Sequence, residues 1–208
     1  MDFKGFKKND FQTFTIDGLD SRMEAIRERI QPKFQAVGEE IKTDLSNTLG
    51  YDMYVHIAQH ARRTVNPPKD TWMAFCNNKR GYKQHPHFQI GLFDDHLFLW
   101  LAYIYEVPNK KEIAEIFLDH TDDIRKSIPG DYMVSLDHTK KSATELGSIN
   151  LTESLERFQN VKKAEFLIGR HFAPDNPLLR DGKTFLNEVK NTFETLSPLY
   201  KLSMRDSQ

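Results

Sequence analysis

The longest apolar run in the sequence, from Leu97 to Tyr105, limits what the chain can fold into. Its nine residues are too few for a membrane-spanning helix, which needs about 20. The run follows a stretch from residue 87 to 92 in which apolar residues alternate with polar or small ones, and Asp94-Asp95 separates the two. This pattern predicts a β-hairpin. Because its return strand, residues 97–107, is apolar on both faces, we expect that strand at the centre of a sheet.

Other stretches also have strand-like patterns. From residue 51 to 58, apolar and polar residues alternate, which suits a strand with one face on a core. A helix is the alternative, because its four-residue spacing would also place His56 and His60 on one side. We favour the strand, which must end before Asn66-Pro67-Pro68, since consecutive prolines do not fit inside a sheet. Shorter strands are predicted at residues 72–75, 132–137 and 164–172.

The rest of the chain has the periodicity of amphipathic helices. Their predicted boundaries are a capping box of Ser21 with Glu24, another of Asn109 with Glu112, closure at Pro129-Gly130, a third box of Asn150 with Glu153, and an end before Pro198. We therefore expect one α+β domain over residues 1–208, with a mainly antiparallel sheet of about five or six strands covered by helices. Its parts are a helical region at about 10–50, a strand-rich block at about 51–107, and a mixed remainder.

Charge and cysteine content restrict the classes of partner. Lysine and arginine total 29 and aspartate and glutamate 30, so the molecule as a whole has no field that would draw it onto nucleic acid or an acidic membrane. The lone cysteine, Cys76, cannot form an intramolecular disulfide, and the first residues contain no apolar stretch typical of a signal peptide. We expect a cytoplasmic protein that does not associate with membranes.

Three sequence blocks resemble a known family. HARRTVNPPKDTWMAF at residues 60–75, KRGYK at 79–83 and PHFQIGLF at 86–93 are similar to the YktB-like family of uncharacterised bacterial proteins, over nearly the whole chain. The resemblance implies a small cytoplasmic α+β protein. It implies no reaction and no catalytic residues.

The strongest functional signal is a local excess of positive charge. Between His60 and His87 there are six basic side chains and one acidic one, Asp70, a net charge of +5 in a nearly neutral protein. Arginine presents a planar fork of donors suited to phosphate or carboxylate. Gly81 would let the loop backbone approach an anion closely. The alternative is that these charges are simply solvated ends of strands and loops.

From this excess we derive a candidate ligand site at the polar edge of the sheet. Basic side chains would hold an anionic, for example phosphorylated, small molecule, two aromatic rings would stack on it, and three imidazoles would donate hydrogen bonds or transfer protons. The basic residues are Arg62, Arg63, Lys79, Arg80 and Lys83, the aromatic residues Trp72 and Tyr82, and the histidines His56, His60 and His87.

Two other function classes stay open. The first is a metal-dependent enzyme, in which histidines would converge with carboxylates; the candidates are His56, His60, His85 and His87, with Asp94, Asp137, His138 or His171. None of them forms a recognised ligand motif, so the sequence identifies no metal site and no cofactor. The second is a nucleic-acid binder, which requires the basic residues to lie along an open stripe. Near-neutral net charge makes nucleic acid the less favoured partner.

No motif in the sequence specifies a reaction. The nucleophile elbow of α/β hydrolases, the phosphate-binding loop of P-loop NTPases and the glycine-rich turn of dinucleotide-binding folds are all missing. A thiol nucleophile would have to be Cys76, and a lone cysteine at a strand end is more often inert.

Overall fold

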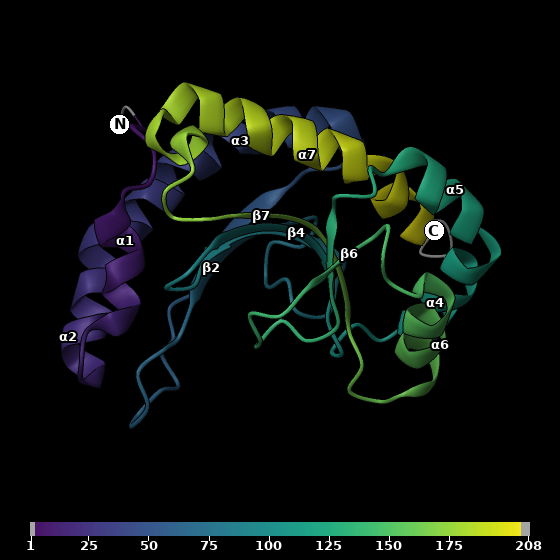
Figure 1. The fold of residues 1–208 in the computed structure, drawn as a ribbon, viewed down its shortest axis with the longest axis horizontal. Coiled ribbons are helices and arrows are strands. Elements are labelled where there is room, and N and C mark those ends of the chain that lie inside the picture. Colours follow the sequence, from purple (N-terminus) through teal and green to yellow (C-terminus); the bar gives the residue numbers. More distant parts are fainter. Residues whose placement is uncertain (1–2, 205–208) are drawn as a thin grey trace.

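The fold is built on an arched, seven-stranded sheet in which every neighbouring pair of strands is antiparallel (Figure 1). The computed structural model describes residues 3–204. Across the sheet the strands are β1 (Tyr54–Ile57), β2 (Thr71–Cys76), β3 (His87–Leu92), β4 (Leu97–Tyr103), β7 (Phe166–Phe172), β5 (Met133–Ser135) and β6 (Thr144–Glu145). The predicted α+β class and the central position of the return strand, β4, are confirmed, although the sheet has seven strands rather than five or six.

Helices cover one face and the ends of this sheet. They are α1 (Lys8–Gln12), α2 (Leu19–Ala25), α3 (Gln31–Leu49), α4 (Lys110–Asp119), α5 (Thr121–Ser127), α6 (Leu151–Asn160) and α7 (Gly182–Ser203). A π-helical turn, Ile26–Ile30, joins α2 to α3, and short 3₁₀ turns lie at Thr13–Thr15 and Pro177–Arg180. The long helices α3 and α7 lie over the convex face (Figure 1). Within residues 3–204, none of the helices is both apolar and long enough to cross a membrane.

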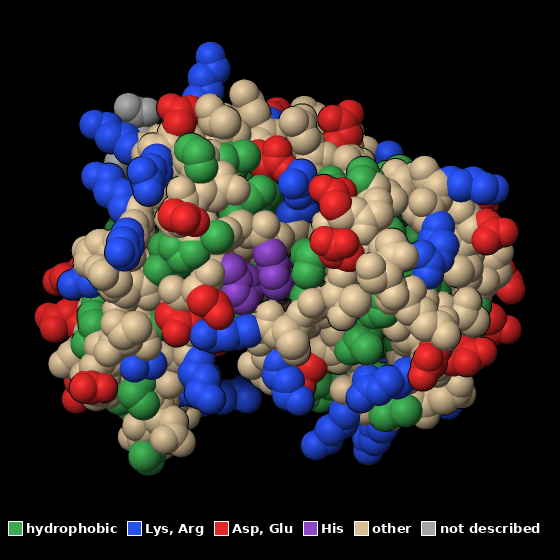
Figure 2. All heavy atoms as spheres, in the orientation of Figure 1, with side chains coloured by type: hydrophobic (Ala, Val, Ile, Leu, Met, Phe, Trp, Pro, Cys, Tyr) green, Lys and Arg blue, Asp and Glu red, His purple; other side chains and the backbone are tan. Residues whose placement is uncertain are grey.

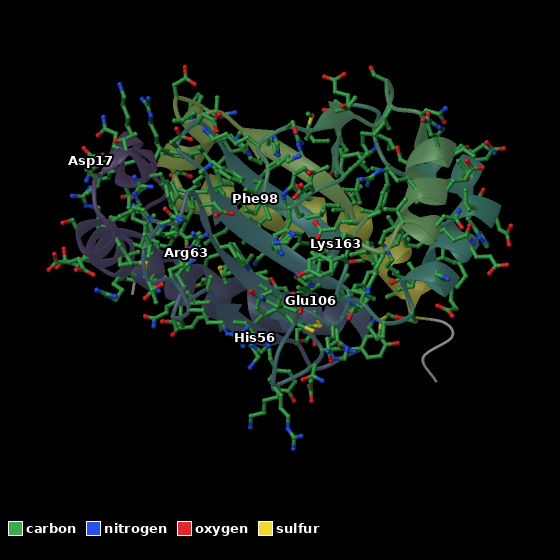
Figure 3. The ribbon with its side chains drawn as sticks, turned by 90° about the horizontal axis from the view of Figure 1, so that it is seen from below. Asp17, His56, Arg63, Phe98, Glu106 and Lys163 are labelled. Carbon is green, nitrogen blue, oxygen red and sulfur yellow. The ribbon has the colours of Figure 1, made fainter. Side chains whose placement is uncertain are left out.

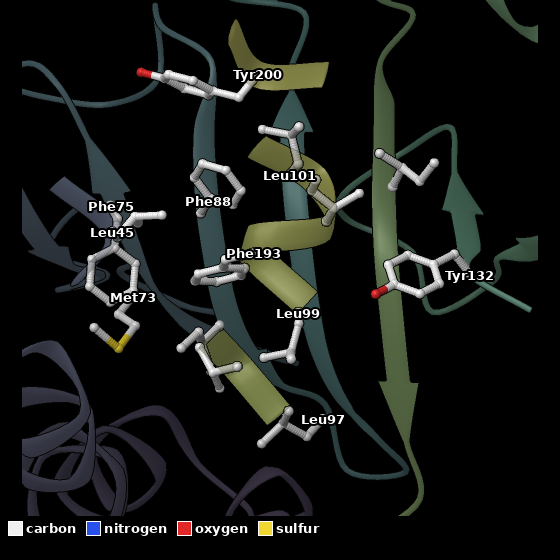
Figure 4. Close-up of a cluster of buried hydrophobic side chains, with 14 of the residues drawn as sticks. Leu45, Met73, Phe75, Phe88, Leu97, Leu99, Leu101, Tyr132, Phe193 and Tyr200 are labelled. Carbon is white, nitrogen blue, oxygen red and sulfur yellow. The ribbon is translucent and has the colours of Figure 1, made fainter. Parts of the chain in front are cut away.

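The main hydrophobic core lies between the convex face and α7. Phe193 of α7 is 1% exposed, and its ring centroid lies 4.7 Å from that of Phe88 in β3 and 6.0 Å from that of Phe75 in β2 (Figure 4). Leu99 and Leu101 of β4 extend the same layer and are fully buried. The alternation seen in the sequence thus places every second residue of the central strands under the helices.

The opposite, concave face carries the polar and aromatic residues of the same strands. Strand register aligns His56 with Ala74, Ala74 with Gln89, and Gln89 with Trp100, so these side chains form one row across four strands. Figure 1 shows mainly loops beneath this face, where the convex face has helices. A smaller apolar cluster, which includes Phe98 and Trp100, covers part of it. Gln89 and Trp100 are nevertheless only 3% and 4% exposed, so the centre of this face is covered, and its half-buried residues lie at the β1 edge.

Three predicted helix boundaries were wrong. Helix α2 begins at Leu19, ahead of the Ser21 capping box, because Gly18 adopts a φ of 82° and turns the chain there. The expected single helix after Asn109 is divided at His120 into α4 and α5. Helix α7 continues through Pro198 to Ser203. A helix-interior proline costs about 3 kcal/mol, but Leu199, Tyr200 and Ser203, which follow it in α7, are buried in the core, and this burial offsets that cost.

Candidate functional site

Two adjoining hollows open at the concave side, between the end of β1 and the loop that joins β2 to β3. The first, the His56 hollow, has a volume of about 670 Å³ and is bordered by His56, Arg80 and His85. The second, the His60 hollow, has about 490 Å³ and is bordered by His60, Arg63 and Trp72. Tyr82, Lys83 and Glu106 border both hollows, so the two form one continuous depression. In Figure 3, which shows the molecule from this side, the labelled His56, Arg63 and Glu106 lie around it.

Most of the residues predicted from the sequence border this depression. His56, Arg80, Tyr82 and Lys83 lie at the His56 hollow, and His60, Arg62, Arg63 and Trp72, with Tyr82 and Lys83 again, lie at the His60 hollow. The two exceptions are Lys79, which is exposed beside the first hollow, and His87, which is fully buried at the start of β3.

Local backbone structure explains how the basic residues reach the depression. After β1 the chain leaves the sheet at His60, whose φ of 50° is in the left-handed region and redirects the following Arg62 and Arg63. In the next loop the backbone N–H of Arg80 donates to Oδ1 of Asn78 at 2.8 Å, a local turn of the kind expected from its sequence. The Nε2 atom of His56 lies 2.9 Å from the carbonyl oxygen of Asn78 and ties this loop to β1.

A cluster of rings forms the inner wall shared by the two hollows. The indole Nε1–H of Trp72 donates to the hydroxyl of Tyr82 at 2.9 Å. The Tyr82 ring packs at 4.9 Å from the ring of His87 and 5.6 Å from that of His56, and His60 lies edge-on to Trp72 at 5.6 Å. The orientations of Trp72 and Tyr82 are therefore set by other side chains before any ligand arrives.

Two histidines of this cluster, His60 and His87, are held in the neutral form. Burial lowers the pKa of both His60 and His87 to about 4, so neither adds positive charge near neutral pH. Both ring nitrogens of His87 are occupied: Nδ1 lies 2.7 Å from the carbonyl oxygen of His85, and Nε2 lies 2.8 Å from Nε2 of Gln89. His87 thus supports Tyr82 from below, while His56 and His60 border open space.

The positive charge at the rim is largely uncompensated. Lys83 lies 3.7 Å from the carboxylate of Glu106. Within residues 3–204, Arg62, Arg63 and Arg80 form no ion pair with a carboxylate, and all three are exposed. Over most of the face shown in Figure 2, by contrast, basic and acidic side chains are mixed, unlike at this rim. Such a rim attracts anions locally, even though the whole protein is nearly neutral.

A buried ion pair near Trp72 was missed by sequence reasoning. Glu165, only 3% exposed, accepts the backbone N–H of His138 at 2.8 Å and lies 2.8 Å from His138 Nδ1. Burial lowers the pKa of His138, but the hydrogen bond and charge of Glu165 outweigh it, so the pKa is raised overall. The His138 ring lies 6.4 Å from that of Trp72. These residues follow β5 and precede β7, so only the pairing of those strands brings them together.

The His138 and Glu165 pair is also part of a group of residues, found within residues 3–204, that could hold a metal ion. Asp137, His138 and Glu165 offer ligand atoms that lie within 4.8 Å of one another. Of the metal candidates predicted from the sequence, only Asp137 and His138 belong to this group. His171 lies elsewhere on the concave face, 4.1 Å from the ring of His96. At Cys76, burial raises the pKa to about 11, so its thiol stays protonated.

Asp70, the only acidic residue between His60 and His87, is a second feature that the sequence did not predict. It is 8% exposed, and burial raises its pKa to about 6, although the positive charges of His138 and Arg63 act in the opposite direction. Asp70 is thus a buried carboxyl group that is costly to ionise, beside the Arg63 rim.

This placement of Asp70 gives a pH-dependent prediction for the variant Asp70→Asn. Because its pKa rises from 3.8 to about 6 on folding, the folded protein holds this proton more tightly than the unfolded chain, and stability is lost as the pH rises through that interval. Asparagine does not titrate. We expect the free energy of unfolding of the variant, relative to wild type, to rise by roughly 2–3 kcal/mol between about pH 4 and pH 8. Urea unfolding at both pH values measures this difference, and equal differences would contradict the burial argument.

Comparison with known proteins places the chain in a family. Residues 6–200 match the family described as a domain of unknown function, DUF1054. The chain belongs to the DUF1054 family. It is 57% identical to a UPF0637 protein of Shouchella clausii over 98% of this chain and 97% of that protein. It is 56% identical to one of Oceanobacillus iheyensis, covering 96% of this chain and 97% of that protein.

A third DUF1054-like relative, the UPF0637 protein of Listeria monocytogenes, is 50% identical over 99% of this chain and its own full length. The resemblance seen in the sequence, to a family of uncharacterised bacterial proteins, is thereby confirmed. Membership of the DUF1054 family carries no assigned reaction, so any function has to be argued from the site.

Proposed function

We propose that this protein binds a phosphorylated or otherwise anionic ligand, about the size of a nucleotide or sugar phosphate, in the depression formed by the His56 and His60 hollows. Arg62, Arg63 and Arg80 would hold the anionic group through charge-assisted hydrogen bonds. The rings of Trp72 and Tyr82 would contact a planar or apolar part of the ligand. His56 or His60 would donate or accept one further hydrogen bond.

One observation carries this proposal. Basic side chains from two separate loops, residues 61–63 and 80–83, border hollows that share Tyr82 and Lys83. Solvated charges at unrelated strand ends would not be expected to border one depression with a prearranged pair of rings. The volumes of about 670 and 490 Å³ also fall within the range of roughly 300–1,000 Å³ that is usual for ligand sites.

A thermal-shift comparison of AMP with adenosine tests this function. Ligand at about 100 times its Kd stabilises the folded state by about 2.7 kcal/mol, which corresponds to a rise in Tm of roughly 5–10 °C for a protein of this size. AMP, pyrophosphate and glucose 6-phosphate are compared at matched ionic strength, with adenosine and glucose as uncharged controls. We expect at least one of the three charged compounds to raise Tm. Equal shifts for charged and uncharged compounds, or none at all, would contradict the proposal.

The Asp137, His138 and Glu165 group supports a second candidate, a metal-dependent enzyme. A divalent ion such as zinc takes imidazole and carboxylate ligands of this kind. However, Nδ1 of His138 already lies within hydrogen-bonding distance of Glu165, so a metal at these atoms would have to replace that contact. Metal analysis of protein purified without a His-tag, with His138→Ala as the control, decides between the two. Stoichiometric metal that is lost in the variant would favour the enzyme.

A further inference from the structure

A third hollow adjoins the proposed ligand site and is not explained by a small ligand. It has a volume of about 480 Å³ and lies where the chain leaves β4 and where α4 begins and α6 ends. Tyr105, Lys111 and Lys162 border it, and we call it the Tyr105 hollow. Glu106 borders this hollow as well as the other two, so all three meet at that side chain.

The Tyr105 hollow also combines unpaired lysines with an exposed ring, although its residues come from other parts of the chain and include the carboxylate of Glu112. Lys111 and Lys162 are exposed and form no ion pair within residues 3–204. Tyr105 is 43% exposed, one of few large apolar side chains left open to this degree in that part of the chain. Lys110, by contrast, is buried and donates to the carbonyl oxygens of Val161 and Ala164, so it serves the fold.

Unpaired positive charges and open rings thus continue along the concave side, past Glu106. In Figure 3, Arg63 lies to the left of the centre of this face, and Glu106 and Lys163 lie near its centre. A single small anion would occupy only one hollow and leave the other cations without a partner. A flexible polyanion with a ring attached to each charge would use all three hollows.

We propose that the anionic ligand is an unpaired nucleic acid strand, whose phosphates contact the basic rim and whose bases stack on rings at the three hollows; this rests on the proposed function of the first two. Base stacking on aromatic side chains tolerates any sequence and requires bases that are not paired. Glu106, at the junction, is half-buried beside Lys83 and presents a carboxylate that can accept the amino group of a base such as cytosine. The near-neutral net charge does not oppose this, because the cations are local to one face.

Fluorescence anisotropy with 5′-labelled oligocytidylates of increasing length tests the proposal. We expect the affinity to rise with length until the strand reaches all three hollows, and the logarithm of the affinity to fall with the logarithm of salt concentration, with a slope of roughly −2 to −3.5 for three to five phosphate contacts. Lys111→Gln with Lys162→Gln should weaken the longer oligomers about tenfold and leave CMP unaffected. The matched control, Lys183→Gln with Lys201→Gln, changes two exposed lysines of α7, on the covered side of the sheet, and should have no effect.

The ring contribution is tested separately at Tyr105. Tyr105→Ala should weaken the longer oligomers by about 5- to 100-fold, whereas Tyr105→Phe, which keeps the ring, should bind as wild type. If CMP binds but longer oligomers bind no better, this inference falls and the proposed function stands. If neither CMP nor the oligomers bind, this inference falls; the proposed function falls with it only when the thermal-shift panel is also negative. Equal binding of inorganic polyphosphate or of duplex DNA would also overturn the inference.

Discussion

Replacing Phe193 with alanine is expected to lower the free energy of unfolding by about 3–5 kcal/mol. Phe193 is 1% exposed and lies where α7 crosses the convex face, against Phe88 and Phe75. Removing its ring leaves a cavity between the longest helix and the sheet that neither element can close without moving. Urea unfolding measured by circular dichroism gives the change.

The exposed ring of Tyr105 provides the control for this stability prediction. Tyr105→Ala removes a side chain of similar size that is 43% exposed, so its effect on stability should stay below about 1 kcal/mol. If Phe193→Ala destabilised the protein no more than Tyr105→Ala does, the packing of α7 against β2 and β3 described above would be wrong.

The largest expected effect on binding is that of replacing Arg63 and Arg80 together with glutamine. Each arginine borders a different one of the two hollows, and neither forms an ion pair with a described carboxylate. A charge-assisted hydrogen bond contributes about 1.5–3 kcal/mol, so the double variant should bind the anionic ligand at least about 100-fold more weakly. Calorimetric titration with the best compound from the thermal-shift panel measures this loss.

Two other exposed arginines give the matched control for this binding prediction. Arg27→Gln with Arg180→Gln makes the same change of net charge at residues that border neither hollow. We expect this pair to keep wild-type affinity, and both double variants to keep wild-type stability. Equal loss of affinity in the two double variants would point to a general charge effect instead of a site.

Local patterns predicted much of the fold. The β3–β4 hairpin followed from strict alternation and the Asp94-Asp95 turn, and the Asn150 cap of α6 is present, with its side chain accepting the N–H of Glu153 at 3.2 Å. Where prediction failed, a distant contact prevailed over a local rule. Helix α7 passes through Pro198 because its last turns are buried, and burial in another element cannot be read from the local sequence.

Sequence reasoning likewise found one part of the candidate site and missed another. Its basic residues were found because they are close together in the chain, and their excess charge is visible there. The Glu165 and His138 pair was missed because 27 residues separate its members and only the β5–β7 pairing joins them. The Tyr105 hollow was missed because the end of β4 and the ends of α4 and α6 meet only in the fold.

The most direct test of the proposed site uses the two tryptophans, whose indole N–H groups give two separate signals in a ¹H–¹⁵N spectrum. Trp72 borders the His60 hollow and donates to Tyr82, whereas Trp100 is 4% exposed and borders neither hollow. Trp72→Phe assigns the signals. Titration with AMP should shift the Trp72 signal in a saturable manner and leave that of Trp100 in place. A Trp72 signal that stays fixed while AMP binds, or one that moves equally with adenosine, would contradict an anion site in this depression.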